Sequence, residues 1–179
     1  MHTEFFTEQI DSCTALLKSR KARYAWVRNN LAYFPILLDI GLDNKHPNQH
    51  KAAWIMELLL VDNLELIQPQ LNHFCTQFSD IKNESTKRSL GKIASLLTQS
   101  KSISLSQAQK ETLIETALIW LIDNTKVAAK CHAIDIILYL SPDFPELTQL
   151  ANETIEQQYT TSSPAFQNRA KKFKQRLGV

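Results

Sequence analysis

Small and apolar residues recur along this chain with the spacing of one helical stripe. A residue at a first position is followed by others three and seven positions on, which brings the three side chains onto one face of an α-helix. The clear copies are Ala52/Ile55/Leu59, Leu90/Ile93/Leu97, Ala133/Ile136/Leu140 and Ala170/Phe173/Leu177, and a fainter copy is Tyr24/Val27/Leu31. Each copy predicts a helix that buries one side.

An apolar segment precedes each striped helix and supplies a partner for it. These segments are residues 5–17, 34–42, 64–78, 113–122 and 147–159. Short polar links such as residues 43–47 and 123–125 separate the two helices of a pair, as expected for stacked helix pairs. Pro35 and Pro69 fall inside two of the segments and should start or kink those helices. The pattern predicts helix pairs of roughly 36 residues each.

Residues 34–59 (FPILLDIGLDNKHPNQHKAAWIMELL) resemble HEAT repeats, and residues 118–140 resemble them as well. The family pattern has an apolar helix, an acidic turn, and a basic residue three positions before an alanine that aliphatic residues follow. The basic position is occupied by Lys21, Lys87 and Lys130. Gln49 and Gln167 depart from it, so the family's ladder of linked charges should be interrupted there.

The resemblance covers nearly the whole chain and implies a fold. It is an all-α, right-handed α-α superhelix of about five HEAT-like helix pairs in a single domain, residues 1–179. The expected repeats are approximately 1–33, 34–61, 62–100, 104–141 and 144–179. This architecture serves unrelated partners, so it does not itself identify a function.

Glycine content excludes several common chemistries. Gly41, Gly91 and Gly178 are isolated, which leaves no GxGxxG turn and no phosphate-binding P-loop. The GxSxG, HExxH and kinase signatures are also missing. We therefore expect no catalytic residues and no cofactor.

Cysteine usage and the N-terminal sequence indicate a compartment. Cys13, Cys75 and Cys131 are widely spaced without a CxxC pair, which fits neither a disulfide framework nor a zinc site. No signal peptide and no membrane-spanning apolar run is apparent. We expect a cytoplasmic protein with no bound metal and no membrane association.

The leading hypothesis is a non-catalytic binding or scaffold module whose partner is another protein. Successive second helices of stacked pairs form an extended concave surface in repeat proteins. The residues expected to line it, because they stand beside the stripes, are Lys51, Trp54, Lys87, Arg88, Lys130 and Arg169. The partner's identity and the oligomeric state stay open.

One alternative is nucleic-acid binding of the DNA-alkylation-repair type, since those glycosylases are also HEAT-like. With 20 basic and 18 acidic residues, the net charge of +2 gives no overall attraction to phosphates. Any such binding would use two basic clusters. The first is Lys18, Arg20, Lys21, Arg23 and Arg28, and the second is Arg169, Lys171, Lys172, Lys174 and Arg176. The other reading of both clusters is the solvated face of a terminal helix.

A second alternative is adenylosuccinate lyase activity. The sequence is similar to short helical proteins that carry this label, and residues 162–169 (SSPAFQNR) resemble the serine-rich loop of the lyase family. The Met and Lys of that loop are absent here. An assay for fumarate release tests this alternative directly.

Overall fold

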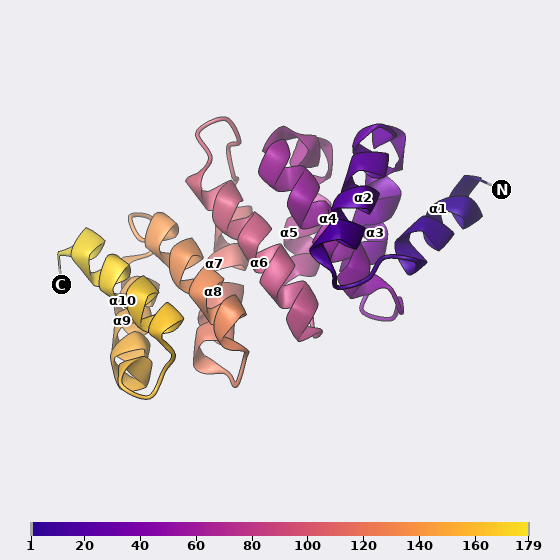
Figure 1. The fold of residues 1–179 in the computed structure, drawn as a ribbon. Helices are drawn as coiled ribbons and strands as arrows, with labels where there is room; N and C mark the ends of the chain where they lie inside the picture. The colour runs from indigo at the N-terminus through magenta and orange to yellow at the C-terminus, as the bar shows by residue number, and fades with distance from the viewer. Residues whose placement is uncertain (1, 179) are drawn as a thin grey trace. The chain divides into compact units, whose positions relative to one another are not determined.

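The computed structural model describes residues 2–178, and over these residues the predicted all-α fold class is confirmed: 78% is helix and no strand occurs. The α-helices, labelled in Figure 1, are α1 (His2–Asp11), α2 (Leu17–Arg28), α3 (Phe34–Leu42), α4 (Gln49–Asp62), α5 (Leu71–Phe78), α6 (Glu84–Gln99), α7 (Gln107–Ile122), α8 (Val127–Leu140), α9 (Pro145–Tyr159) and α10 (Pro164–Leu177). Two 3-10 segments are η1 (Leu31–Tyr33) and η2 (Leu64–Gln70). The chain forms two compact units, residues 1–90 and 91–179, and the boundary falls inside α6.

The striped helices bury most of the residues that the pattern marks. Fully or almost fully buried are Ala52, Ile55, Leu59, Leu90, Ile93, Leu97, Ala133, Ile136 and Leu140. Helix α10 buries Ala170 and Phe173, and leaves Leu177 half-buried in its last turn. The fainter copy departs from the prediction, because α2 ends at Arg28 and Leu31 lies beyond it in η1, 42% exposed. Tyr24, Val27 and Leu31 therefore do not share one helix face.

In the first unit, α4 contacts the helices on either side of it. It packs against α1, α2, α3 and η2, while α3 also packs against α5. At Gly41, α3 and α4 lie close together: a Cβ there would lie 2.8 Å from the Met56 Cε, the end of a flexible side chain that would have to shift, and 3.6 Å from the Ala53 backbone nitrogen. The buried side of α4 is continuous, with Ala53, Met56 and Leu60 beside its stripe.

In the second unit, α8 is the central helix, as α4 is in the first. It packs against α7, α9 and α10, and α9 also packs against α7 and α10. Gly91 of α6 is buried, and a Cβ there would lie 3.1 Å from the His132 Cβ and 3.2 Å from the Trp120 Cζ3. A side chain at this position would push against two neighbours at once.

The ends of the helices follow from local sequence. Pro69 lies inside η2, so the apolar segment 64–78 is divided into η2 and α5 as its proline suggested. Ser106 forms a capping box with Gln109 at the start of α7. Pro164 occupies the first turn of α10, and Gly178 ends that helix with a φ of 75°, a left-handed conformation that glycine adopts without strain.

Candidate binding surface

Trp54 lies on the outer side of α4 and is held from three directions. Its Nε1 donates a hydrogen bond to the Ser85 Oγ at 2.8 Å. The Arg20 guanidinium lies 5.7 Å from its ring centroid, and the His50 ring meets it edge-on at 5.0 Å. The indole is half-buried, so part of it still reaches the surface. Trp54 is therefore an aromatic group whose orientation the fold already sets.

Arg88 of α6 joins a bidentate ion pair with Glu57 of α4. The Arg88 Nη1 lies 3.2 Å from the Glu57 Oε1, and the Nη2 lies 2.7 Å from the Oε2. The Ser89 Oγ donates to the same Oε2 at 2.7 Å. Since the two charged side chains are 33% and 18% exposed, the pair ties α6 to α4 more than it presents a free cation.

Lys51 also has an internal partner. Its Nζ donates to the Asp11 carbonyl oxygen at 2.5 Å and lies 3.3 Å from the Asp11 Oδ1. This hydrogen bond, together with one from Asn48, lowers the pKa of the Asp11 carboxyl. Lys87 forms a 3.0 Å ion pair with Glu84, one turn earlier in α6.

Lys130 reaches back to the end of the preceding helix. Its Nζ donates to the Leu121 carbonyl oxygen at 2.9 Å and to the Gln158 Oε1 at 2.8 Å. Burial lowers the pKa of this amine. The contact satisfies a carbonyl at the C-terminus of α7, where no intrahelical donor is available.

Gln49 and Gln167 stand three residues before Ala52 and Ala170, as Lys130 does before Ala133, and they also hydrogen-bond to the segment that precedes their helix. The Gln49 Nε2 donates to the Asn44 Oδ1 at 3.2 Å, in the turn before α4. The Gln167 Nε2 donates to the Tyr159 carbonyl oxygen at 3.0 Å, at the end of α9. Where the pattern predicts an interrupted charge ladder, neutral amides hydrogen-bond to the preceding turn or helix.

Arg169 of α10 pairs with Asp135 of α8. The Asp135 side chain is only 6% exposed, whereas that of Arg169 is 36% exposed. The pair links α8 to α10 within the second unit, as Glu57 and Arg88 link α4 to α6 within the first. Five of the six predicted binding residues are thus cations with an internal partner, and Trp54 is the sixth.

Several cations of the two basic clusters also have partners within the chain. Hydrogen bonds or ion pairs within the chain engage four of their cations: Arg23 with Gln9, Arg28 with Asp62, Arg169 with Asp135 and Lys174 with Glu156. Arg20 and Arg176 lie against the rings of Trp54 and Tyr139, contacts that orient these two cations without neutralising them. The remaining cations, Lys18, Lys21, Lys171 and Lys172, are exposed. Each cluster therefore offers fewer cations to a phosphate backbone than its sequence suggests.

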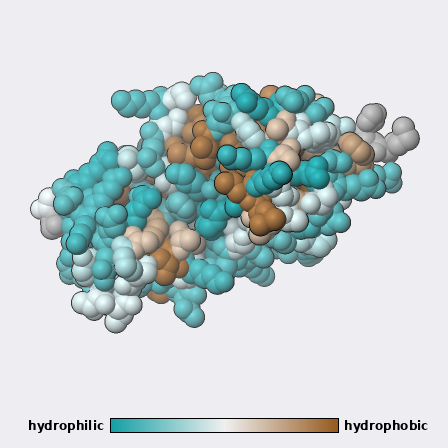
Figure 2. All heavy atoms as spheres, viewed as in Figure 1, coloured by the Kyte–Doolittle hydropathy of each residue, from teal (hydrophilic) through white to brown (hydrophobic). Residues whose placement is uncertain are grey.

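Apolar side chains also reach the surface, where they stand among hydrophilic ones (Figure 2). On α4, Leu58 is half-buried one turn after Trp54, and Val61 is 56% exposed one turn further. The three form a row along the outer side of α4, which we call the α4 row. The sequence pattern missed Leu58 and Val61, because it marked only the residues beside the start of the stripe.

The described residues offer little for metal or thiol chemistry. Within residues 2–178, no group of three or more His, Cys, Asp and Glu side chains is arranged to hold a metal ion. Cys13, Cys75 and Cys131 are buried, and burial raises the pKa of each thiol, that of Cys75 to about 12. No helix in the same stretch is both long and apolar enough to cross a membrane.

Comparisons of the chain with protein-family models, with curated proteins and with solved structures found no match.

Proposed function

We propose that this chain is a HEAT-like repeat protein that acts as a non-catalytic binding module for another protein. In this proposal about five helix pairs form one right-handed superhelix, and the second helices of the pairs supply the contact surface. One observation carries it: within each unit, second helices pack on second helices and first helices on first helices. These contacts are α2 with α4 and α3 with α5 in one unit, and α8 with α10 and α7 with α9 in the other.

The α4 row is the best candidate for the contact itself. It combines an oriented indole, a side chain that often dominates the binding energy of protein interfaces, with two partly exposed aliphatic side chains that extend the apolar surface around it. Lys51 and Arg88 flank it as fixed, paired charges. Since the Lys51 and Arg88 side chains are already ordered by their partners, this chain would lose little of their conformational entropy when another protein contacts them.

Val61 gives a cleaner test than the paired cations. Reversing the charge of Arg88 would set two carboxylates against each other and destabilise the fold. Val61→Asp changes a side chain that is 56% exposed, and Ile122→Asp is a matched control at 53% exposure on a first helix. Partners captured from the native cell would be identified by mass spectrometry, then purified and titrated against wild type and both variants.

A specific partner should bind Val61→Asp at least tenfold more weakly than wild type, because a desolvated carboxylate would replace an apolar contact. Ile122→Asp should retain wild-type affinity. Equal affinity of wild type and Val61→Asp for every purified partner would refute the assignment of the α4 row.

Nucleic-acid binding is a second candidate, supported by α10. This helix contains no acidic residue, and Lys171 and Lys172 are exposed on it. A gel-shift titration with duplex and single-stranded DNA across salt concentrations tests it, since affinity from phosphate contacts falls steeply with salt. The variant Lys171→Gln/Lys172→Gln should abolish the shift. No shift at low salt with the wild-type protein would exclude this candidate.

A further inference from the structure

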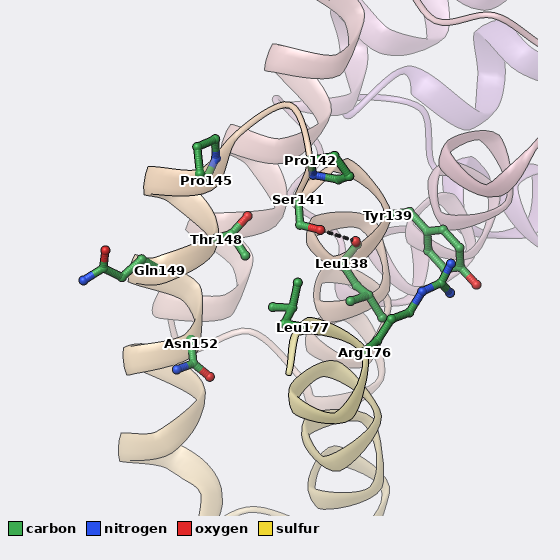
Figure 3. A pocket seen from close by; sticks show the side chains of 10 residues that line it. All are labelled: Leu138, Tyr139, Ser141, Pro142, Pro145, Thr148, Gln149, Asn152, Arg176 and Leu177. Carbon is green, nitrogen blue, oxygen red and sulfur yellow. Dashed lines mark hydrogen bonds between the residues drawn. The ribbon is translucent and has the colours of Figure 1, made fainter. Parts of the chain in front are cut away.

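A cavity of about 720 Å³ lies in the second unit where α8, α9 and α10 meet. Figure 3 shows it at the C-terminal ends of α8 and α10, with the first turns of α9 forming one side. Its apolar lining comes from Leu138, Pro142, Pro145 and Leu177. The size lies within the range of small-molecule sites in proteins.

Two of the hydroxyl groups that line this cavity, those of Ser141 and Thr148, donate their protons within the chain. The Ser141 Oγ donates to the Leu138 carbonyl oxygen at 2.8 Å, the hydrogen bond drawn in Figure 3. The Thr148 Oγ1 donates to the Phe144 carbonyl oxygen at 2.8 Å. Both hydroxyl oxygens therefore retain only acceptor capacity toward the cavity.

Asn152 carries an unmet acceptor. Its Oδ1 is shielded from solvent and has no hydrogen-bond partner within the described part of the chain. In Figure 3 its amide extends from α9 with the oxygen on the side of α10 and Leu177. A buried acceptor without a partner costs free energy, but because this oxygen is closed off from solvent it is a feature of the packing beside the cavity and not a contact for a ligand.

Arg176 is the one charged residue among the ten that line the cavity, and none of the ten is acidic. The Cζ of its guanidinium lies over the Tyr139 ring, 4.4 Å from the ring centroid (Figure 3). This contact occupies a face of the guanidinium, whereas the N–H donors point outward along its edge, in a geometry that suits a carboxylate. The cavity thus combines a cation, an apolar lining and two hydroxyl oxygens that can accept hydrogen bonds.

We propose that this cavity binds a small organic carboxylate that has an apolar body and a hydrogen-bond donor. The carboxylate contacts Arg176, the apolar body lies against Leu138 and Leu177, and the donor faces the hydroxyl oxygens of Ser141 and Thr148. An N-acyl amino acid has all three features. This site is separate from the α4 row and does not depend on the proposed protein partner.

The probe is N-octanoylglycine, and its neutral counterpart is N-octanoylglycinamide, which keeps the chain and the amide N–H but lacks the charge. Both are titrated by calorimetry and by backbone-amide NMR against wild type, Arg176→Gln and Lys172→Gln. The two variants remove one exposed cation each from the same helix, and only Arg176 lines the cavity.

The wild-type protein should bind the acid about tenfold more tightly than the amide, the size of one charge-assisted hydrogen bond. Arg176→Gln should bind both compounds equally, and Lys172→Gln should behave as wild type. Shifted amide signals should lie at residues 138–152 and 176–177. No binding of either compound, equal losses in both variants, or shifts centred elsewhere would each overturn the proposal.

Discussion

Replacing Arg169 by methionine should destabilise the fold much more than replacing its partner Asp135 by asparagine. The asymmetry follows from exposure, since the carboxylate is 6% exposed and the guanidinium 36%. Without Arg169, the Asp135 charge would remain in the interior with no counter-charge. Without the Asp135 charge, the arginine can still be solvated.

The losses of unfolding free energy expected for Arg169→Met and Asp135→Asn differ enough for equilibrium unfolding to distinguish them. Breaking a buried pair by removing one partner costs about 3–5 kcal/mol, and the accessible Arg169 side places this case near the lower value, about 3 kcal/mol. Asp135→Asn should cost about 1 kcal/mol, the loss of one charge-assisted hydrogen bond in a partly solvated setting. The double variant should be more stable than Arg169→Met alone, because the unpaired charge is gone.

Urea unfolding followed by circular dichroism measures all three variants at pH 7. Lys174→Met is the matched control on α10, because its partner Glu156 is 56% exposed, and it should cost less than 1 kcal/mol, as exposed pairs do. Equal costs for Arg169→Met and Asp135→Asn, or a double variant no more stable than Arg169→Met, would refute the reasoning.

Three further changes test other parts of the structure. Gly91→Val should destabilise the fold by about 2 kcal/mol, because its side chain would overlap His132 and Trp120; thermal unfolding measures this, and an unchanged melting temperature would contradict the close packing. Asn152→Leu should leave the fold as stable or stabilise it by about 1 kcal/mol in urea unfolding, since it removes an unsatisfied buried acceptor; a large loss would show that the oxygen has a partner. With the Cys75 pKa at about 12 in the folded protein and near 9 when unfolded, the unfolded state loses its proton first, so this group lowers stability between pH 9 and 12, by at most about 1.4 kcal/mol per pH unit. Cys75→Ala should reduce the loss of unfolding free energy between pH 9 and 12. If the variant and the wild-type protein lost the same free energy over this range, the raised pKa of Cys75 would be refuted.

The sequence predicted the buried faces because helical spacing alone determines them. Ala133 and Ile136 recur at the right interval, and tertiary packing did not override that signal. The prediction was wrong at Leu31, where the interval continued past the end of α2, and nothing in the spacing marks that end.

The candidate site was harder to predict, because surface exposure depends on partners elsewhere in the chain. Lys130 and Arg88 read as free cations in the sequence, whereas each is held by a group 9 to 31 residues away. Asp135 sits in an apolar run, which could have indicated a buried acid that needs a cation. Its partner Arg169, 34 residues away, was marked by the pattern for a binding surface and not for a pair with a buried acid.

Three side-chain links between alternate helices have a consequence for how this chain folds. Trp54 to Ser85, Glu57 to Arg88 and Asp135 to Arg169 join residues 31 to 34 positions apart. Each link closes a loop of similar and moderate length, so the entropic cost of closing the loop is nearly the same for all three. The first two links lie within one compact unit and the third within the other, so each unit can begin to fold by itself, and damage to one link is felt mainly by the helices that it joins.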